Sequence, residues 1–410
     1  MDVEEFTGQE PVVDRLKRLK KSCAGKIFSD LLDDEGNQYV DLVMEGGGVL
    51  GVALVGYTYV LEEMGLRFRG AGGTSAGSIN ALLVAALGPP QARKSEQIVK
   101  LLADLRMFEF VDGDADVKDF VEKVVEGAGK FTLAWKGVQV LDTLDENLGL
   151  NPGGAFFAWV SRALIAAGAH TASALAERIA TVPPGFRHRL GRPLPYEGTG
   201  GRLALVAADV STETKVELPK MAPMYWKRPD KVDPALFARA SMSIPFFFYP
   251  LVLGDLPKGP KAREAWRTLA GYDQPIPDAV KLVDGGIMSN FPIDLFHVPG
   301  RVPNAPTFGA KLGRDSRLKH DIRTPFQLAG AVFDSASHCL DYDFIVRHPD
   351  YRNLVTWIDT GEHHWLDFFM TDEDKADLFT RGALAAADFL DSFDWGAYKK
   401  VRAKLAKAYG

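Results

Sequence analysis

The chain has few of the features that mark secreted, metal-binding or nucleic-acid-binding proteins. Only two of its 410 residues, Cys23 and Cys339, are cysteines, and this number excludes a disulfide framework and a cysteine-rich zinc site. Its 54 acidic residues outnumber its 48 basic ones, whereas a surface that binds nucleic acid needs an excess of Lys and Arg. We therefore expect two reduced thiols, no nucleic-acid partner, and no metal ion or other cofactor.

The sequence also lacks a segment that could cross a membrane or direct secretion. A membrane span requires about 20 consecutive apolar residues, and every apolar run in this chain is interrupted earlier by Gly, Ser or a charged residue. The chain begins Met-Asp-Val-Glu-Glu, which is acidic where a signal peptide is basic. We expect a cytoplasmic protein that can still bind peripherally at a membrane.

The first hundred residues alternate short apolar runs with helical patterns. Residues 39–44 form an apolar run typical of a buried strand, and residues 50–64 then place apolar side chains at helical spacing. A second strand is predicted over residues 67–71 and a second helix over residues 78–87, and a glycine-rich turn follows each strand. This alternation predicts parallel strands with helices packed on the faces of the sheet.

The rest of the chain mixes helical and strand patterns. Residues 94–195 are mostly helical in pattern and predict a helical insertion, or lid, that covers the sheet, whereas residues 254–279 look like a polar connection. Further strands are predicted at residues 203–210, 280–283, 307–312 and 354–358, and further helices at residues 234–240, 372–391 and 394–408. We divide the chain into an N-terminal segment (1–35), one α/β domain (36–360) and a helical C-terminal extension (361–410).

The second glycine-rich turn contains a G-x-S-x-G pattern, Gly73-Thr74-Ser75-Ala76-Gly77. A Ser on a tight turn between a strand and a helix projects its hydroxyl out of the sheet, and the flanking Gly73 and Gly77 avoid the clashes that Cβ atoms would cause there. The N-terminus of the following helix favours negative charge beside the Ser. Ser75 is therefore the candidate nucleophile.

The first turn, Glu45-Gly46-Gly47-Gly48-Val49-Leu50-Gly51, contains a G-x-G-x-x-G pattern, so a dinucleotide-binding loop is a competing interpretation. Such a loop needs an acidic residue at the end of the next strand, about 20 residues on, and here the Ser75 turn occupies that place. A phosphate-binding P-loop would need Gly-Lys-Ser or Gly-Lys-Thr, which does not follow. We favour an oxyanion hole at Gly46, Gly47 and Gly48, with the N–H groups of Gly47 and Gly48 as its donors.

A nucleophilic Ser needs a base that accepts its proton. None of the eight histidines stands in a distinctive loop after a predicted strand, and the pair His363-His364 beside Trp365 resembles an amphipathic surface. Asp284 is the better candidate, because it ends the apolar run 280–283 and precedes Gly285 and Gly286, which allow close approach. An Asp-Gly-Gly turn without a catalytic role is the alternative.

Together these three motifs resemble those of the patatin-like phospholipases. That family combines a Gly-rich oxyanion loop and a G-x-S-x-G turn with an Asp-Gly-Gly or Asp-Gly-Ala motif, whose Asp completes a Ser–Asp dyad. Two further stretches are similar to family patterns: Ala240-Ser241-Met242-Ser243-Ile244-Pro245-Phe246 and Asp284-Gly285-Gly286-Ile287-Met288-Ser289-Asn290-Phe291-Pro292. The resemblance covers about residues 38–312. It departs at Leu50, where the family often has a basic residue that can assist headgroup or oxyanion binding.

The resemblance implies a three-layer α/β/α patatin-like fold and a lipid acyl hydrolase of the phospholipase A or lysophospholipase type, acting on membrane phospholipid or lysophospholipid. It assigns Ser75 as nucleophile and Asp284 as general base, with an acyl-enzyme that water hydrolyses. The glycines that would support these motifs are Gly51, Gly73, Gly77, Gly285 and Gly286. Two alternatives remain open: an esterase or thioesterase for soluble acyl esters, and a gated lipid-binding effector that is latent until activated.

Three apolar clusters are candidates for contact with lipid. They are Met224-Tyr225-Trp226 followed by Lys227 and Arg228, residues 246–251, and residues 365–370. Aromatic side chains beside basic ones suit a bilayer interface, so the first cluster is the most interesting of the three. Packing in the core is the alternative for each cluster.

Overall fold

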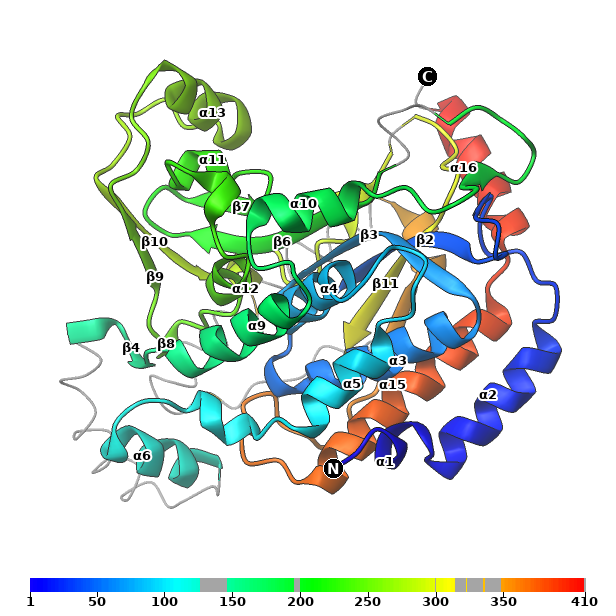
Figure 1. Cartoon of the computed structure of the whole chain (residues 1–410), viewed down its shortest axis with the longest axis horizontal. Coiled ribbons are helices and arrows are strands. Elements are labelled where there is room, and N and C mark those ends of the chain that lie inside the picture. The colour runs from blue at the N-terminus through cyan, green and yellow to red at the C-terminus, as the bar shows by residue number, and fades with distance from the viewer. Residues whose placement is uncertain are drawn as a thin grey trace.

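A large central β-sheet organises the chain (Figure 1). The computed structural model describes residues 1–125, 146–194, 200–298, 300–313, 322, 335 and 348–408. Within these ranges the main path of the sheet runs β12 (Val355–Ile358), β11 (Thr307–Leu312), β2 (Gln38–Met44), β3 (Leu66–Thr74), β6 (Arg202–Asp209), β10 (Ala279–Asp284) and β9 (Leu251–Gly254). The strands from β12 to β6 are parallel, and β10 and β9 are antiparallel to their neighbours. The predicted α/β fold with a mostly parallel sheet is confirmed.

Several short strands complete the sheet or lie beside it. β7 (Thr214–Leu218) pairs antiparallel with β6, and β1 (Leu31–Leu32) connects the start of β2 to β5 (Arg187–His188). β4 (Gly149–Asn151) and β8 (Phe246–Phe248) form a separate parallel pair. The sequence analysis predicts none of them, because two to five residues carry too little periodicity to be recognised.

Each of the two glycine-rich turns leads from a strand into a helix, as predicted. β2 continues through the 3₁₀ helix η1 (Gly48–Gly51) into α3 (Val52–Glu63), and β3 continues into α4 (Ala76–Ala86). Both α-helices are buried on nearly all sides, which explains why they are apolar throughout rather than amphipathic. The two turns therefore lie at the carboxyl ends of neighbouring parallel strands.

Both faces of the sheet are covered by other elements. Successive side chains of a strand point to opposite faces, so two neighbouring residues of β11 show what covers each face. Phe308 of β11 packs edge-on against Phe389 of α15 (Asp372–Ser392). The next residue, Gly309, lies against Ile293 of η6 (Ile293–Phe296) on the opposite face. The sheet is thus the middle of three layers.

The region after α4 is mostly helical over the residues that the structure describes. Its helices are α5 (Ser95–Ala103), η2 (Met107–Phe110), α6 (Ala115–Val125), α9 (Gly154–Ala166) and α10 (Ala172–Ala180). Later in the chain come α11 (Ala222–Tyr225), η4 (Pro229–Lys231), α12 (Ala235–Ser241), η5 (Gly285–Ile287) and η7 (Pro349–Asn353). Parts of the predicted insertion, residues 126–145 and residue 195, lie outside the described residues.

Residues 254–279, predicted to be a polar excursion that contains Pro and Gly, include a helix that was not predicted, α13 (Pro260–Ala270). Pro260 occupies the first turn, where a missing N–H costs nothing, and Gly271 ends the helix in the left-handed conformation. The helix buries Trp266 and Ala262 and leaves its charged face in solvent. Those charged residues make the narrow apolar stripe hard to recognise in the sequence.

The terminal helices pack on different neighbours: α15 packs against α3, the two N-terminal helices pack against α15, and the last helix packs against η7. They are α1 (Glu4–Thr7) and α2 (Glu10–Ser22) at one end of the chain and α15 and α16 (Trp395–Ala408) at the other. A Cβ atom on Gly56 of α3 would overlap the carbonyl of Phe379 in α15, and one on Gly382 of α15 would overlap the carbonyl of Ala53 in α3. The backbones of the two helices are therefore in contact, and this packing depends on both glycines.

Candidate active site

Ser75 occupies a strained turn between β3 and α4. Its φ of 51° and ψ of −121° lie in a region that residues with a side chain rarely adopt, so surrounding contacts must hold the turn in place. The Ser75 N–H donates to the Ser241 hydroxyl at 2.9 Å, and that hydroxyl donates to the Val206 carbonyl at 2.5 Å. Ser241 thereby ties the turn to β6. Ser241 belongs to a stretch that is similar to a family pattern, but nothing in the sequence indicates this role.

The flanking glycines bring the end of β2 against the Ser75 turn. A Cβ atom on Gly77 would overlap the carbonyl of Met44, and one on Gly73 would lie 2.6 Å from the same oxygen. Met44 is the last residue of β2. Because only glycine permits this approach, the G-x-S-x-G pattern sets the position of Ser75 relative to the turn at residues 45–51.

Asp284 ends β10 and faces Ser75. Its N–H donates to the Ser243 carbonyl at 2.8 Å, and its carboxylate accepts the N–H of Gly286 at 2.8 Å and lies near the Ser75 hydroxyl. Only 2% of Asp284 is exposed. Burial raises the pKa of the carboxyl to about 7, against the Ser75 hydroxyl and the Gly286 N–H, which lower it. The structure thus places the predicted nucleophile beside the predicted base.

The glycine-rich turn lies beside Ser75. A Cβ atom on Gly46 would be 3.1 Å from the Ser75 Cβ. The Gly46 N–H donates to the Asn290 carbonyl at 3.0 Å, and the Asn290 side-chain amide donates to the Gly46 carbonyl at 3.2 Å. Gly46 therefore anchors the turn, and its N–H is not available to a ligand. Within the described part of the chain, the N–H groups of Gly47 and Gly48 donate no hydrogen bond.

A segment far along the chain also holds this turn. The Val49 N–H donates to the Trp365 carbonyl at 3.1 Å. Gly48 has a φ of 55°, and a Cβ atom there would overlap the same carbonyl, so the position requires glycine for two reasons. No signal in the sequence places Trp365 beside the turn.

A buried ion pair fixes Glu45, the residue before the glycines. Its carboxylate contacts Lys311 Nζ at 2.6 Å and accepts the N–H of Leu312 at 2.7 Å. Both charged residues are 4% exposed, and the Lys311 ammonium lies over the rings of Phe291 and Trp357. Glu45 thus joins the start of the turn to β11.

An apolar cavity of about 80 Å³ opens at Ser75. Its lining comes from the glycine-rich turn, from α4, from the helical region after α4 and from the stretch after α12, and includes Gly48, Leu102, Phe110, Phe156, Met242 and Phe368. Such a site suits a hydrocarbon chain, because apolar surface is removed from water when the chain enters.

The described histidines lie away from this cavity. His297 shares a hydrogen bond of 2.6 Å with the Tyr351 hydroxyl, and His363 contacts Asp377 at 2.8 Å. None of the histidines that the structure describes lines the cavity. His320 and His338, like Cys339, lie outside the described residues.

The three clusters that are candidates for lipid contact differ in how deeply they are buried. Met224 and Tyr225 are 0% and 2% exposed, so the expectation of membrane contact by these two residues is wrong. Phe368 is also buried and lines the cavity. In the cluster at residues 246–251, Phe248 is buried but Phe246 is 54% exposed.

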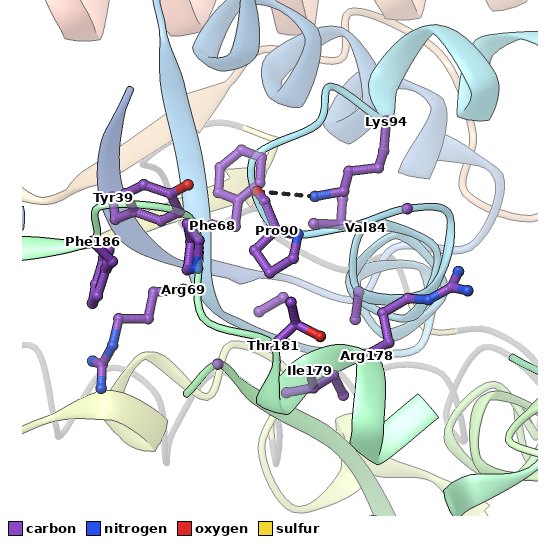
Figure 2. Close-up of a pocket in the computed structure, with 15 residues that line it drawn as sticks. Tyr39, Phe68, Arg69, Val84, Pro90, Lys94, Arg178, Ile179, Thr181 and Phe186 are labelled. Carbon is purple, nitrogen blue, oxygen red and sulfur yellow. Dashed lines mark hydrogen bonds between the residues drawn. The ribbon is translucent and has the colours of Figure 1, made fainter. Parts of the chain in front are cut away.

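A second cavity, of about 40 Å³, lies beside β3 and holds Lys94 (Figure 2). The Lys94 ammonium donates to the Pro90 carbonyl at 3.2 Å, whereas Arg178 turns away to the Ala86 carbonyl. Lys94 is 2% exposed, and burial lowers its pKa to about 8.

Replacing Lys94 by Met is expected to raise the free energy of unfolding at pH 7 by on the order of 2–3 kcal/mol. Between pH 8 and 10 the unfolded chain binds more protons than the folded one, so the stability of the wild type should rise across this range. In the variant that rise should disappear. Urea unfolding at pH 7 and 9.5 measures both effects, with the exposed Lys100→Met as control. A less stable Lys94→Met protein at pH 7 would contradict the argument.

Neither a membrane span nor a metal site is found in the described ranges. No helix there is both long and apolar enough to cross a bilayer. No group of three or more His, Cys, Asp or Glu side chains there is arranged to hold a metal ion.

Solved structures give a distant likeness. VipD from Legionella pneumophila has a TM-score of 0.40 and 16% identity over 89% of this chain and 70% of VipD. The type III effector ExoU has a TM-score of 0.37 and 13% identity over 86% of this chain and 52% of ExoU. At these scores the likeness does not bear on function.

Sequence comparison is more decisive. The protein named uncharacterized protein YqhO, from Bacillus subtilis (strain 168), is 29% identical over 359 residues, which make up 87% of this chain and all of YqhO. A family model described as patatin-like phospholipase matches residues 42–297. That range is more than half of the chain and contains the glycine-rich turn, the Ser75 turn and the Asp284 motif. The chain belongs to the patatin-like phospholipase family.

Proposed function

We propose that this protein is a lipid acyl hydrolase of the phospholipase A or lysophospholipase type that cleaves fatty acyl esters through a Ser75–Asp284 dyad. Membership of the family supports hydrolysis of lipids. The observation that carries the finer assignment is the position of the Ser75 hydroxyl close enough to the buried Asp284 carboxylate to lower its pKa, at the edge of an apolar cavity.

In the acylation step the Ser75 Oγ attacks the ester carbonyl carbon while Asp284 accepts the hydroxyl proton. The carbonyl oxygen becomes negatively charged and accepts hydrogen bonds from the N–H groups of Gly47 and Gly48, the two donors of the turn that have no other partner among the described residues. The C–O bond to the leaving alcohol then breaks, and Asp284 returns the proton to that alcohol. The acyl chain is now esterified to Ser75.

Deacylation repeats these steps with water. Asp284 accepts a proton from the water, whose oxygen attacks the acyl carbonyl, and the same two N–H groups stabilise the oxyanion. Collapse of this intermediate releases the fatty acid, and the proton returns to Ser75. The positive end of α4, which begins at Ala76, also favours the negative charge in both steps.

The rate of ester hydrolysis is expected to follow the ionisation of Asp284. Only the carboxylate accepts a proton, and its pKa is about 7. Therefore kcat/KM should fall about tenfold per pH unit below pH 6 and level off above pH 8. A profile from pH 5 to 9 with a soluble p-nitrophenyl butyrate substrate measures this. An activity that stays constant down to pH 5 would exclude Asp284, with this pKa, as the base.

An alkyl fluorophosphonate tests the nucleophile directly, because it forms a stable covalent adduct with an activated Ser. We expect one adduct, located by mass spectrometry on the peptide that contains Ser75 and absent from Ser75→Ala. Faster labelling by a long-chain than by a short-chain reagent would support a lipid substrate, whereas equal rates would favour soluble acyl esters. An adduct on another Ser would overturn the assignment.

A further inference from the structure

Two large apolar residues at the start of the β4–β8 ladder, Phe246 and Leu148, are exposed to solvent. Phe246 is 54% exposed and Leu148 is 46% exposed. Phe246 is paired with Gly149 in the β4–β8 ladder, and Leu148 immediately precedes Gly149. Figure 1 shows β4 and β8 side by side at one edge of the molecule. We call Phe246 and Leu148 the rim pair.

The backbone holds the rim pair in an unfavourable conformation. Phe246 has a φ of 67° and Leu148 a φ of 60°, both in the left-handed region where Gly and Asn are favoured over bulky residues. Exposure of each apolar side chain to water also raises the free energy of the folded state. Strained positions of this kind are concentrated at functional sites, so the display of both side chains requires an explanation other than packing.

The rim pair is continuous with the wall of the acyl cavity. Phe246 lies between Ile244 and Phe248, which both line that cavity. The intervening Phe247 stacks on Phe368, a third lining residue, with ring centroids 4.9 Å apart and planes 9° apart. A lipid that contacts the rim pair would therefore lie directly beside the space proposed for its acyl chain.

The acidic residues near the rim pair determine which lipid surfaces can approach it. Tyr249, three residues after Phe246, has a raised pKa, first because of burial and then because Asp112, Asp114 and Glu146 lie nearby. Asp114 and Glu146 are exposed, whereas Arg239, which donates to the Tyr249 carbonyl at 2.8 Å, is buried. An anionic membrane would therefore be repelled here, in contrast to the basic patches that bind anionic lipids. A zwitterionic or uncharged lipid surface carries no such penalty.

We propose that Phe246 and Leu148 insert into the interface of a zwitterionic or uncharged lipid surface and so place the mouth of the cavity against its substrate. This inference rests on the proposed function for the fate of the lipid, but binding to the surface does not depend on catalysis.

The test uses the full chain with Ser75→Ala, so that lipid is not consumed. Binding to sedimenting vesicles would be compared for Phe246→Asn, Leu148→Asn and the double variant. The vesicles contain phosphatidylcholine alone or with about 30 mol% phosphatidylserine, a fraction at which surface charge dominates. Asn relieves the strain at positive φ, so these variants should be at least as stable as the parent. The matched control is Leu190→Asn, since Leu190 is 66% exposed and follows β5, near the start of β2 rather than its end.

We expect each rim substitution to weaken partitioning into phosphatidylcholine about tenfold, and the double substitution on the order of 100-fold. Leu190→Asn should bind like the parent, and phosphatidylserine should not strengthen binding. Unchanged binding by the double variant would overturn the proposal. So would a strong, salt-sensitive preference for phosphatidylserine, or a dimer of the parent that the double variant abolishes, since the rim pair would then contact a second copy.

The two proposals can fail separately. With Ser75 restored, the double variant should still hydrolyse soluble p-nitrophenyl butyrate, because neither rim residue lines the cavity. Ester hydrolysis that depends on Ser75, together with normal vesicle binding by the double variant, would refute the docking surface alone. Vesicle binding that depends on the rim pair, without ester hydrolysis by any protein, would refute the proposed function alone.

Discussion

Replacing Ser75 by Ala is expected to reduce fatty-acid release from phospholipid vesicles by at least about 10⁴-fold, because the attacking oxygen is removed and only the oxyanion donors and the binding cavity remain. Asp284→Asn should cause a loss of similar order, since an amide cannot accept the Ser75 proton. The two losses should not add in the double variant, because the two residues act as one unit. Fatty-acid release measured for all three variants and the wild type tests this.

Stability measurements distinguish these losses from unfolding. The pKa of Asp284 is raised in the folded state, so its ionisation costs stability as the pH rises through about 7. Asp284→Asn should therefore be more stable than the wild type at pH 8 while being inactive. His297→Ala serves as the control for activity, because His297 contacts Tyr351 rather than the cavity. Activity that survives in Asp284→Asn would show that another group is the base.

Replacing Lys311 by Met is expected to lower the free energy of unfolding by about 3–5 kcal/mol. The substitution leaves the Glu45 carboxylate buried with the Leu312 N–H but without its cation. It also removes the ammonium from between the rings of Phe291 and Trp357. Guanidinium unfolding at pH 7 measures the loss.

The double variant Lys311→Met with Glu45→Gln provides the matched control. The neutral amide removes the unpaired charge, so much of the lost stability should return. Lys215→Met is a second control, since its pairing with Asp294 at 3.7 Å is partly exposed and contributes little. If Lys311→Met is as stable as the wild type, the ion pair does not hold the glycine-rich turn to β11.

Local patterns predicted those parts of the fold that depend on near neighbours in the sequence. The apolar run before Gly46 and the helical spacing after it are confirmed by β2 and α3. The same alternation around Ser75 is confirmed by β3 and α4. Each of these elements is buried on most sides, so its composition alone distinguishes it from a loop. In contrast, α13 buries only a narrow stripe, and its charged face dominated the sequence pattern.

Contacts between distant residues could not be predicted in the same way. The sequence singles out Ser75 and Asp284, but it does not show that Ser241 holds the Ser75 N–H or that Asn290 occupies the N–H of Gly46. Whether Trp365 reaches Gly48 depends on how the last third of the chain crosses the sheet. Tertiary packing, not local preference, determines these contacts.

The contacts of Trp365 and Lys311 have a practical consequence for anyone who excises a minimal catalytic fragment. The match to the family model ends at residue 297, yet the glycine-rich turn is held by Lys311 of β11 and by the Trp365 carbonyl. A fragment cut at residue 297 would retain Ser75, Asp284 and all three motifs while losing both supports. The region that matches the family model is therefore shorter than the region needed to hold the active site in place. An inactive fragment would say nothing about the chemistry of the intact protein.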